Sequence, residues 1–276
     1  MTDDPLALDL NVDAALLLRE LTEIDAYPAV LALMPNIFRG EDRERVRAVL
    51  TPQLAAIGVV DDHDQVHPVV RAWLQCLDRP DIELAARVID FDDAGKPAAM
   101  LRFSLTRRGP MHVLALRNDD HVVIQPVFTD GERLDPMAAA IAAVLGVART
   151  AAFDPLTAAS EDFSAVPAEP EQRRRALFAL GASSHTAAVL TRALDGIVRR
   201  AEVVMIEHTD GVSTTPELCL SVLDTVEGRL VVVPATALDG QTRSTYLPGD
   251  EAALRAGVRA LVELLPGGSW FDHSRN

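Results

Sequence analysis

The feature that most restricts the fold of this chain is a series of short apolar runs that occurs twice. In each series four strand-like runs follow one another, separated by turn residues, and a helical stretch closes the series. Strands joined by such short turns pair antiparallel, because a tight hairpin reverses the chain. We therefore predict two four-stranded antiparallel meanders, the first at 82–90, 98–106, 111–117 and 121–128 and the second at 197–207, 214–224, 229–234 and 241–246.

Helices are predicted on both sides of each meander. Apolar residues recur there every three or four positions, which is the pattern of a helix with one buried face. A short strand at 6–10 precedes the first helix, and the stretch 147–170, rich in Ala, Ser, Pro and Asp, is predicted to be a connector. The predicted helices lie at 12–24, 41–57, 68–77, 135–145, 171–180 and 183–194, with a last one after Asp250.

The two parts of the chain share the same order of elements: helices, four strands and one helix. Gly109 matches Gly228, and Leu145 matches Leu265, at nearly the same spacing along the chain. We expect a quasi-twofold repeat with halves at 1–150 and 151–276 in one compact unit, of the α/β (α+β) class with an antiparallel sheet. Since unpaired strand edges are otherwise exposed, the meanders are expected to join as one sheet. Coincidence of common elements remains the alternative to a duplication.

The charge of the chain excludes one large class of partners. Its 41 acidic residues against 26 Lys and Arg give a formal net charge of −15, whereas binding to phosphates needs a concentrated basic face. We expect no nucleic-acid partner. The acidic N-terminus lacks the features of a signal peptide, and no apolar run reaches 18 residues, so we expect a cytoplasmic protein without a membrane span.

Residues that carry chemistry are sparse. Cys76 and Cys219 lie far apart and outside any C-x-x-C motif, so neither a zinc site nor a redox site is indicated. Histidines and carboxylates crowd only between Asp61 and His67, where His63 and His67 have a metal-binding spacing. Pro68 and the missing apolar period favour a turn there. No nucleotide-binding, zinc-protease or nucleophile motif occurs. We expect no enzyme, no catalytic residue, no bound metal and no cofactor; the alternative is an acidic metal- or ligand-binding α/β domain, or a hydrolase, with a site between Asp61 and His67.

Several motifs, in order over nearly the full length, resemble the EspG family of type VII (ESX) secretion systems. The last of them is the longest, and two early ones, around Tyr27 and around Gly58, are similar too. The main motifs are Ala115-Leu116-Arg117-Asn118, Gly228-Arg229-Leu230, Tyr246-Leu247-Pro248-Gly249 and Leu265-Pro266-Gly267-Gly268-Ser269-Trp270-Phe271.

This resemblance implies a function and an architecture. Members of the family are cytosolic specificity chaperones, which bind PE/PPE heterodimers by the exposed apolar tip of the helical PPE subunit, keep them soluble and deliver them to one secretion machine. The family fold is quasi-twofold, with a central antiparallel β-sheet flanked by two helical bundles. We expect the free protein to be a monomer or a weak homodimer.

The resemblance also implies where the partner binds. In the family, contact is made by the sheet, by the loop between its second and third strands, and by the C-terminal bundle. Carried onto this chain, the loop brings Phe91, Asp92 and Lys96, although an inward-packed Phe91 is an equal alternative. Which alternate residues of the sheet face outward stays open. The candidates on the sheet are Glu202, Val204 and Ile206 in one run and Glu217, Cys219 and Ser221 in the next.

Overall fold

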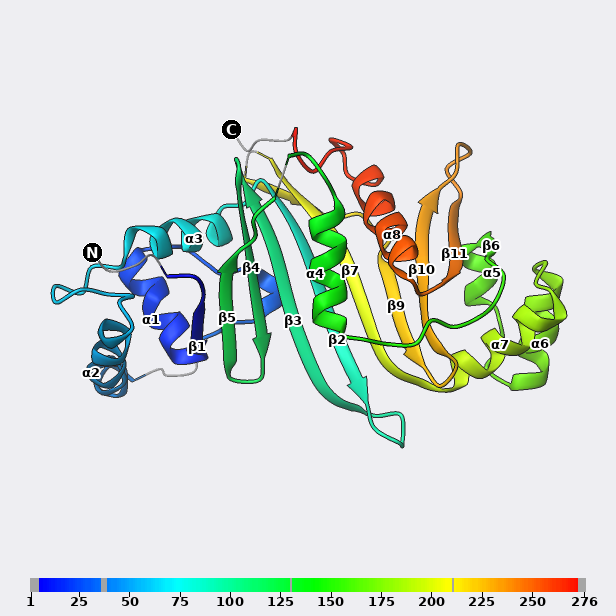
Figure 1. Cartoon of the computed structure of the whole chain (residues 1–276), viewed down its shortest axis with the longest axis horizontal. Helices are drawn as coiled ribbons and strands as arrows, with labels where there is room; N and C mark the ends of the chain where they lie inside the picture. Colours follow the sequence, from blue (N-terminus) through cyan, green and yellow to red (C-terminus); the bar gives the residue numbers. More distant parts are fainter. Residues whose placement is uncertain (1–4, 36–38, 130, 210, 273–276) are drawn as a thin grey trace.

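A computed structural model describes residues 5–35, 39–129, 131–209 and 211–272 of the chain. Within these residues eleven strands form one sheet in the order β1-β5-β4-β3-β2-β7-β9-β10-β11-β6, with β8 paired to β7 (Figure 1). The strands are β1 (Leu8–Asn11), β2 (Ile82–Phe91), β3 (Pro97–Arg108), β4 (Met111–Asn118), β5 (His121–Pro126), β6 (Leu156–Ala159), β7 (Ile197–Thr209), β8 (Val212–Thr214), β9 (Leu220–Thr225), β10 (Gly228–Thr236) and β11 (Thr242–Pro248).

The two meanders join through their first strands. β2 and β7 pair antiparallel, from Ile82 opposite Glu207 to Asp90 opposite Arg199. Outward from this pair the order is the same in both directions: β3 and β9, β4 and β10, β5 and β11, then β1 and β6 at the two edges. The predicted continuous antiparallel sheet and its quasi-twofold arrangement are therefore confirmed.

Helices cover the sheet unequally. α4 and α8 lie side by side over the middle of one face, while α1 to α3 and α5 to α7 gather at the two ends (Figure 1). The helices are α1 (Val12–Thr22), η1 (Ala29–Leu31), α2 (Gly40–Ala56), α3 (Pro68–Asp78), α4 (Asp135–Leu145), α5 (Ser160–Ser164), α6 (Pro170–Ala179), α7 (Ser184–Asp195) and α8 (Glu251–Glu263).

Two predictions of secondary structure were wrong. The predicted connector 147–170 contains β6 and α5, because β6 is stabilised by its pairing with the distant β11, which local composition cannot reveal. The predicted strand 214–224 is interrupted between β8 and β9. Pro216 lies in that interval and has no N–H to donate to a neighbouring strand.

Three hydrophobic cores follow from this layering. One lies under α4 and α8 and takes Leu84, Val203 and Val222 from the middle of the sheet. The other two lie on the opposite face, where α1 and α3 cover β1, β4 and β5, and where α6 and α7 cover parts of β9 and β10. On the same face η1 lies against β2, β3 and β4. The middle of that second face contributes to neither of these end cores.

Candidate functional site

The strand β7 has one covered and one open side. Side chains of a strand point alternately to the two faces of a sheet. Ala201, Val203 and Met205 are buried beneath α4 and α8, whereas Glu202, Val204 and Ile206, which alternate with them, are half-buried on the other face. The structure thus decides the question that the sequence left open: Glu202, Val204 and Ile206 face away from α4 and α8.

Neighbouring strands extend this open side. Arg87 of β2 lies opposite Glu202, Ala85 lies opposite Val204, and Arg102 of β3 lies opposite Arg87. On the other side of β7, Ser221 of β9 lies opposite Glu202. We call this surface the open strip and define it by six residues, Arg87, Arg102, Glu202, Val204, Ile206 and Ser221.

The three candidates near β9 are placed differently from one another. Ser221 belongs to the strand and to the open strip, and its Oγ lies 3.7 Å from the Sγ of Cys219. Cys219 is half-buried just before the strand, and Glu217 is exposed in the interval between β8 and β9. The expectation that Glu217 and Cys219 are residues of a strand was wrong, because the strand begins only at Leu220.

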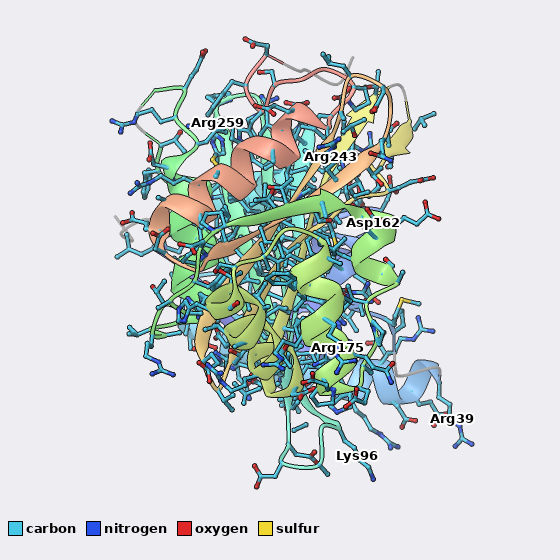
Figure 2. All side chains as sticks on the ribbon, turned by 90° about the vertical axis from the view of Figure 1, so that its right-hand side faces the viewer. Arg39, Lys96, Asp162, Arg175, Arg243 and Arg259 are labelled. Atoms are coloured by element: carbon cyan, nitrogen blue, oxygen red, sulfur yellow. The ribbon has the colours of Figure 1, made fainter. Side chains whose placement is uncertain are left out.

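The hairpin between β2 and β3 carries the other three candidates. The Asp92 carboxylate accepts hydrogen bonds from the backbone N–H groups of Ala94 (2.9 Å) and Lys96 (2.8 Å), so it shapes the turn. Phe91 is half-buried at the point where the register of the two strands shifts. Lys96 is exposed near the tip of the hairpin, which projects beyond the sheet (Figure 2).

Two residues of the open strip, Arg87 and Arg102, were missed by the sequence reasoning. Each lies in an apolar run, and a lone Arg in such a run reads as an ordinary surface position. The feature that sets Arg87 and Arg102 apart is the register of the hairpin, which places them directly opposite each other across β2 and β3. This pairing can be recognised only when the length of the turn between β2 and β3 is known.

The alternative site between Asp61 and His67 is a turn in the structure. The Asp61 carboxylate accepts hydrogen bonds from the backbone N–H groups of His63 (2.8 Å) and Gln65 (2.9 Å), and these bonds hold the pKa of Asp61 below its usual value. His67 is the N-cap of α3 and accepts from the N–H of Val69. In the described part of the chain no three His, Cys, Asp or Glu side chains are grouped so as to hold a metal ion.

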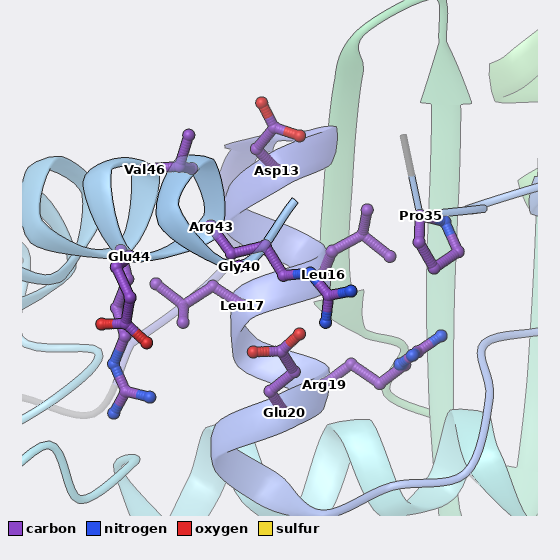
Figure 3. Close-up of a pocket in the computed structure, with 11 residues that line it drawn as sticks. Asp13, Leu16, Leu17, Arg19, Glu20, Pro35, Gly40, Arg43, Glu44 and Val46 are labelled. Atoms are coloured by element: carbon purple, nitrogen blue, oxygen red, sulfur yellow. The ribbon is translucent and has the colours of Figure 1, made fainter. Parts of the chain in front are cut away.

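A hollow between α1 and α2 and the thiol of Cys76 are two further places on this chain where reactive side chains could lie. Between α1 and α2, residues of both charges line a hollow, and Figure 3 shows the guanidinium of Arg43 reaching from α2 toward Glu20 on α1. The thiol of Cys76 is buried and lies 3.5 Å from the hydroxyl of Thr106. Burial raises the pKa of Cys76 to about 11, so the thiol stays protonated near neutral pH and is a poor nucleophile.

The motifs that resemble a known family serve structure. Arg229 is buried, pairs with Asp224 and donates to the carbonyl groups of Leu145 and Gly146, so it ties the end of α4 to β10. Gly228 has φ +116°, and a Cβ there would lie 2.6 Å from a backbone oxygen. Trp270 is fully buried and donates from Nε1 to Nε2 of His112 (3.0 Å).

Similarity to known proteins extends over nearly the whole chain. The model of the EspG family matches residues 11–260. The chain is 32% identical over 273 residues to the ESX-1 secretion-associated protein EspG1 of Mycobacterium marinum, covering 99% of this chain and 93% of that protein. It is 30% identical to the ESX-3 secretion-associated protein EspG3 of Mycolicibacterium smegmatis, covering 97% of this chain and 90% of that protein.

The fold is also similar to a solved structure, that of the Mycobacterium tuberculosis type VII secretion system chaperone EspG5 in complex with a PE25-PPE41 dimer. The TM-score is 0.79 at 22% sequence identity, and the match covers 97% of this chain and 100% of that chain. Among the residues described for the present chain, no helix is both long and apolar enough to span a bilayer.

Proposed function

Because this chain belongs to the EspG family, we propose that it is a cytoplasmic specificity chaperone of a type VII secretion system, which binds a PE/PPE dimer and escorts it to export. The observation that carries this proposal is the agreement of the fold, over nearly all of both chains, with that of a chaperone solved together with such a dimer. Escort requires selective binding and release, and no chemical step.

The open strip supplies a surface suited to that binding. Val204 and Ile206 are half-buried apolar side chains, yet they belong to none of the three cores. Apolar area that the chain itself leaves partly uncovered favours association, because burying it removes the area from water. The strip is therefore proposed to receive the apolar helical tip of the PPE subunit.

The hairpin between β2 and β3 and the segment before β9 border the strip at different places. Phe91 and Lys96 are proposed to contact the partner from the hairpin, while Glu217 and Cys219 contact it from beside β9. Polar side chains at the border of an apolar contact set its register. Asp92 contributes indirectly, since its carboxylate is held by the turn.

Co-expression tests the proposal. PE/PPE pairs encoded in the same genome as this chain are produced together with it, purified through a tag on the chaperone, and separated by size exclusion. We expect one pair, or a small group of related pairs, to elute with the chaperone as a stable complex. A set of well-folded pairs of which none co-elutes would contradict the function proposed here.

A further inference from the structure

Arg87 and Arg102 form a pair of like charges on the open strip. They lie directly opposite each other across β2 and β3, Arg87 exposed and Arg102 half-buried. Neither has an Asp or Glu oxygen within 4.0 Å among the residues that the structure describes. Like charges placed opposite each other on a sheet are unfavourable. This cluster is notable in a chain whose net charge is −15, since carboxylates are abundant elsewhere.

The charged residues nearest in the sheet are already engaged. Arg117 of β4 lies opposite Arg102, and its guanidinium donates to the backbone carbonyl groups of Leu31 and Ala32. Glu202 lies opposite Arg87 on the other side, but its carboxylate is 3.5 Å from the guanidinium of Arg200. Among the residues that the structure describes, the row across β4, β3 and β2 therefore presents two guanidinium groups, those of Arg87 and Arg102, without a carboxylate as a partner.

Apolar side chains flank these two arginines. Val204 lies two residues from Glu202 along β7, on the same face and opposite Ala85, and Ile206 continues that face. On the other side, Ile89 and Met100 lie opposite each other, two residues further along β2 and β3, and both are half-buried. A ligand that fits this surface must combine apolar contact with at least one negative charge, because guanidinium groups bind carboxylates through paired hydrogen bonds.

We propose that Arg87 and Arg102 bind a carboxylate that the PE/PPE dimer carries next to its apolar tip. The inference rests on the proposed function and adds the chemistry that selects the partner: apolar residues supply contact area, and the acidic side chain supplies register and discrimination against tips that lack it.

The test measures how tightly two charge-neutralising variants bind the PE/PPE dimer that the wild-type chaperone retains. In Arg87→Gln/Arg102→Gln the dissociation constant is expected to rise roughly 10-fold or more, as for loss of a charge-assisted hydrogen bond. The control, Arg259→Gln, removes one exposed positive charge from α8 on the opposite face (Figure 2) and should change affinity by less than about 2-fold. Isothermal titration calorimetry at two salt concentrations measures both variants.

The outcomes separate this inference from the function itself. If the wild-type chaperone retains no pair, the proposed function fails; if the double variant binds as tightly as wild type, only the inference fails. Removing two opposed positive charges should leave the melting temperature of the partner-free chaperone unchanged or raise it. A lower melting temperature of the double variant would therefore also contradict the inference about Arg87 and Arg102. Replacing acidic residues at the partner's tip by Gln, one at a time, should reproduce the loss for one of them.

Discussion

Two faces of a single strand show how this molecule divides its tasks. Val203 is fully buried beneath α4 and α8, whereas its neighbour Val204 is half-buried on the open strip. Both are the same residue type in the same strand, so the difference comes from what lies over each face. Helices of the chain itself complete one face, and we propose that helices of a partner complete the other.

Placing the same negative charge on each face of β7 tests this difference most directly. Val203→Asp would bury a carboxylate without a partner and is expected to lower the free energy of unfolding by about 4 kcal/mol or more. Val204→Asp should cost less than about 1 kcal/mol, because its side chain retains access to water, but it should weaken the complex with the PE/PPE dimer. Urea denaturation compares the two variants; equal losses of stability would contradict the division of the faces.

A second substitution examines how the covered face is closed. Trp270→Phe keeps an aromatic ring but removes the N–H that His112 accepts. We expect a loss of about 2 kcal/mol, because a buried acceptor is left unsatisfied beside a small cavity. Phe271→Leu, at the half-buried neighbouring position, is the matched control with a smaller loss. Thermal unfolding followed by circular dichroism measures both, and a larger loss for Phe271→Leu would refute this role of Trp270.

On the open side, Phe91 is the residue whose orientation matters most. Phe91→Arg should weaken the complex roughly 10-fold if the ring contacts the partner, while the melting temperature falls by no more than a few degrees. Cys219→Arg, at the opposite border of the strip, is expected to behave in the same way. A large drop in the melting temperature of Phe91→Arg would instead show that the ring packs inward, and would remove it from the proposed contact.

The covered face should also respond to pH, through His112. Burial lowers the pKa of this imidazole below 6.5, and Trp270 donates to its Nε2, which must therefore carry no proton. The unfolded chain binds the proton on His112 more readily than the folded chain does. The contribution of this hydrogen bond to the free energy of unfolding is therefore complete above about pH 6.5 and is lost as the pH falls below that value. Unfolding free energies at pH 7.5 and 5.5 should differ less in His112→Gln, whose amide oxygen can accept the same bond. An equal difference would exclude His112 as the source.

The smallest effect is expected for the ion pair at the edge of the strip. Glu202→Gln removes the partially exposed partner of Arg200 and should change stability by less than about 0.5 kcal/mol. If the strip recognises a negative charge, the same change should leave binding intact or make it slightly tighter, because one more positive charge becomes available. Weaker binding of Glu202→Gln would indicate that the partner presents a positive charge there.

Much of the fold could be predicted from the sequence, because the information for it is local. The turn at Asp239-Gly240 and the apolar alternation of β7 depend on a few consecutive residues, and both were read correctly. The errors in predicted secondary structure occurred where the conformation of a segment depends on residues that are distant in the sequence or on a proline that interrupts a strand. β6 is stabilised by its pairing with β11. The predicted strand 214–224 is interrupted around Pro216, so that β9 begins only at Leu220. Of the open strip, the sequence supplied the three residues of β7 and Ser221 of β9, but not Arg87 and Arg102.

Local sequence patterns were enough to indicate the family of the protein and several residues that hold its helices and strands together. Gly228, Arg229 and Trp270 lie in the motifs that resemble the family, and in the structure Gly228 has a positive φ while Arg229 and Trp270 are buried and hydrogen-bonded. Which face of the sheet is open, and which side chains meet there, could be learned only from the packing of the whole chain. Facing and register depend on how β2, β3 and β7 pair and on where α4 and α8 pack, and these contacts join residues that are far apart along the chain.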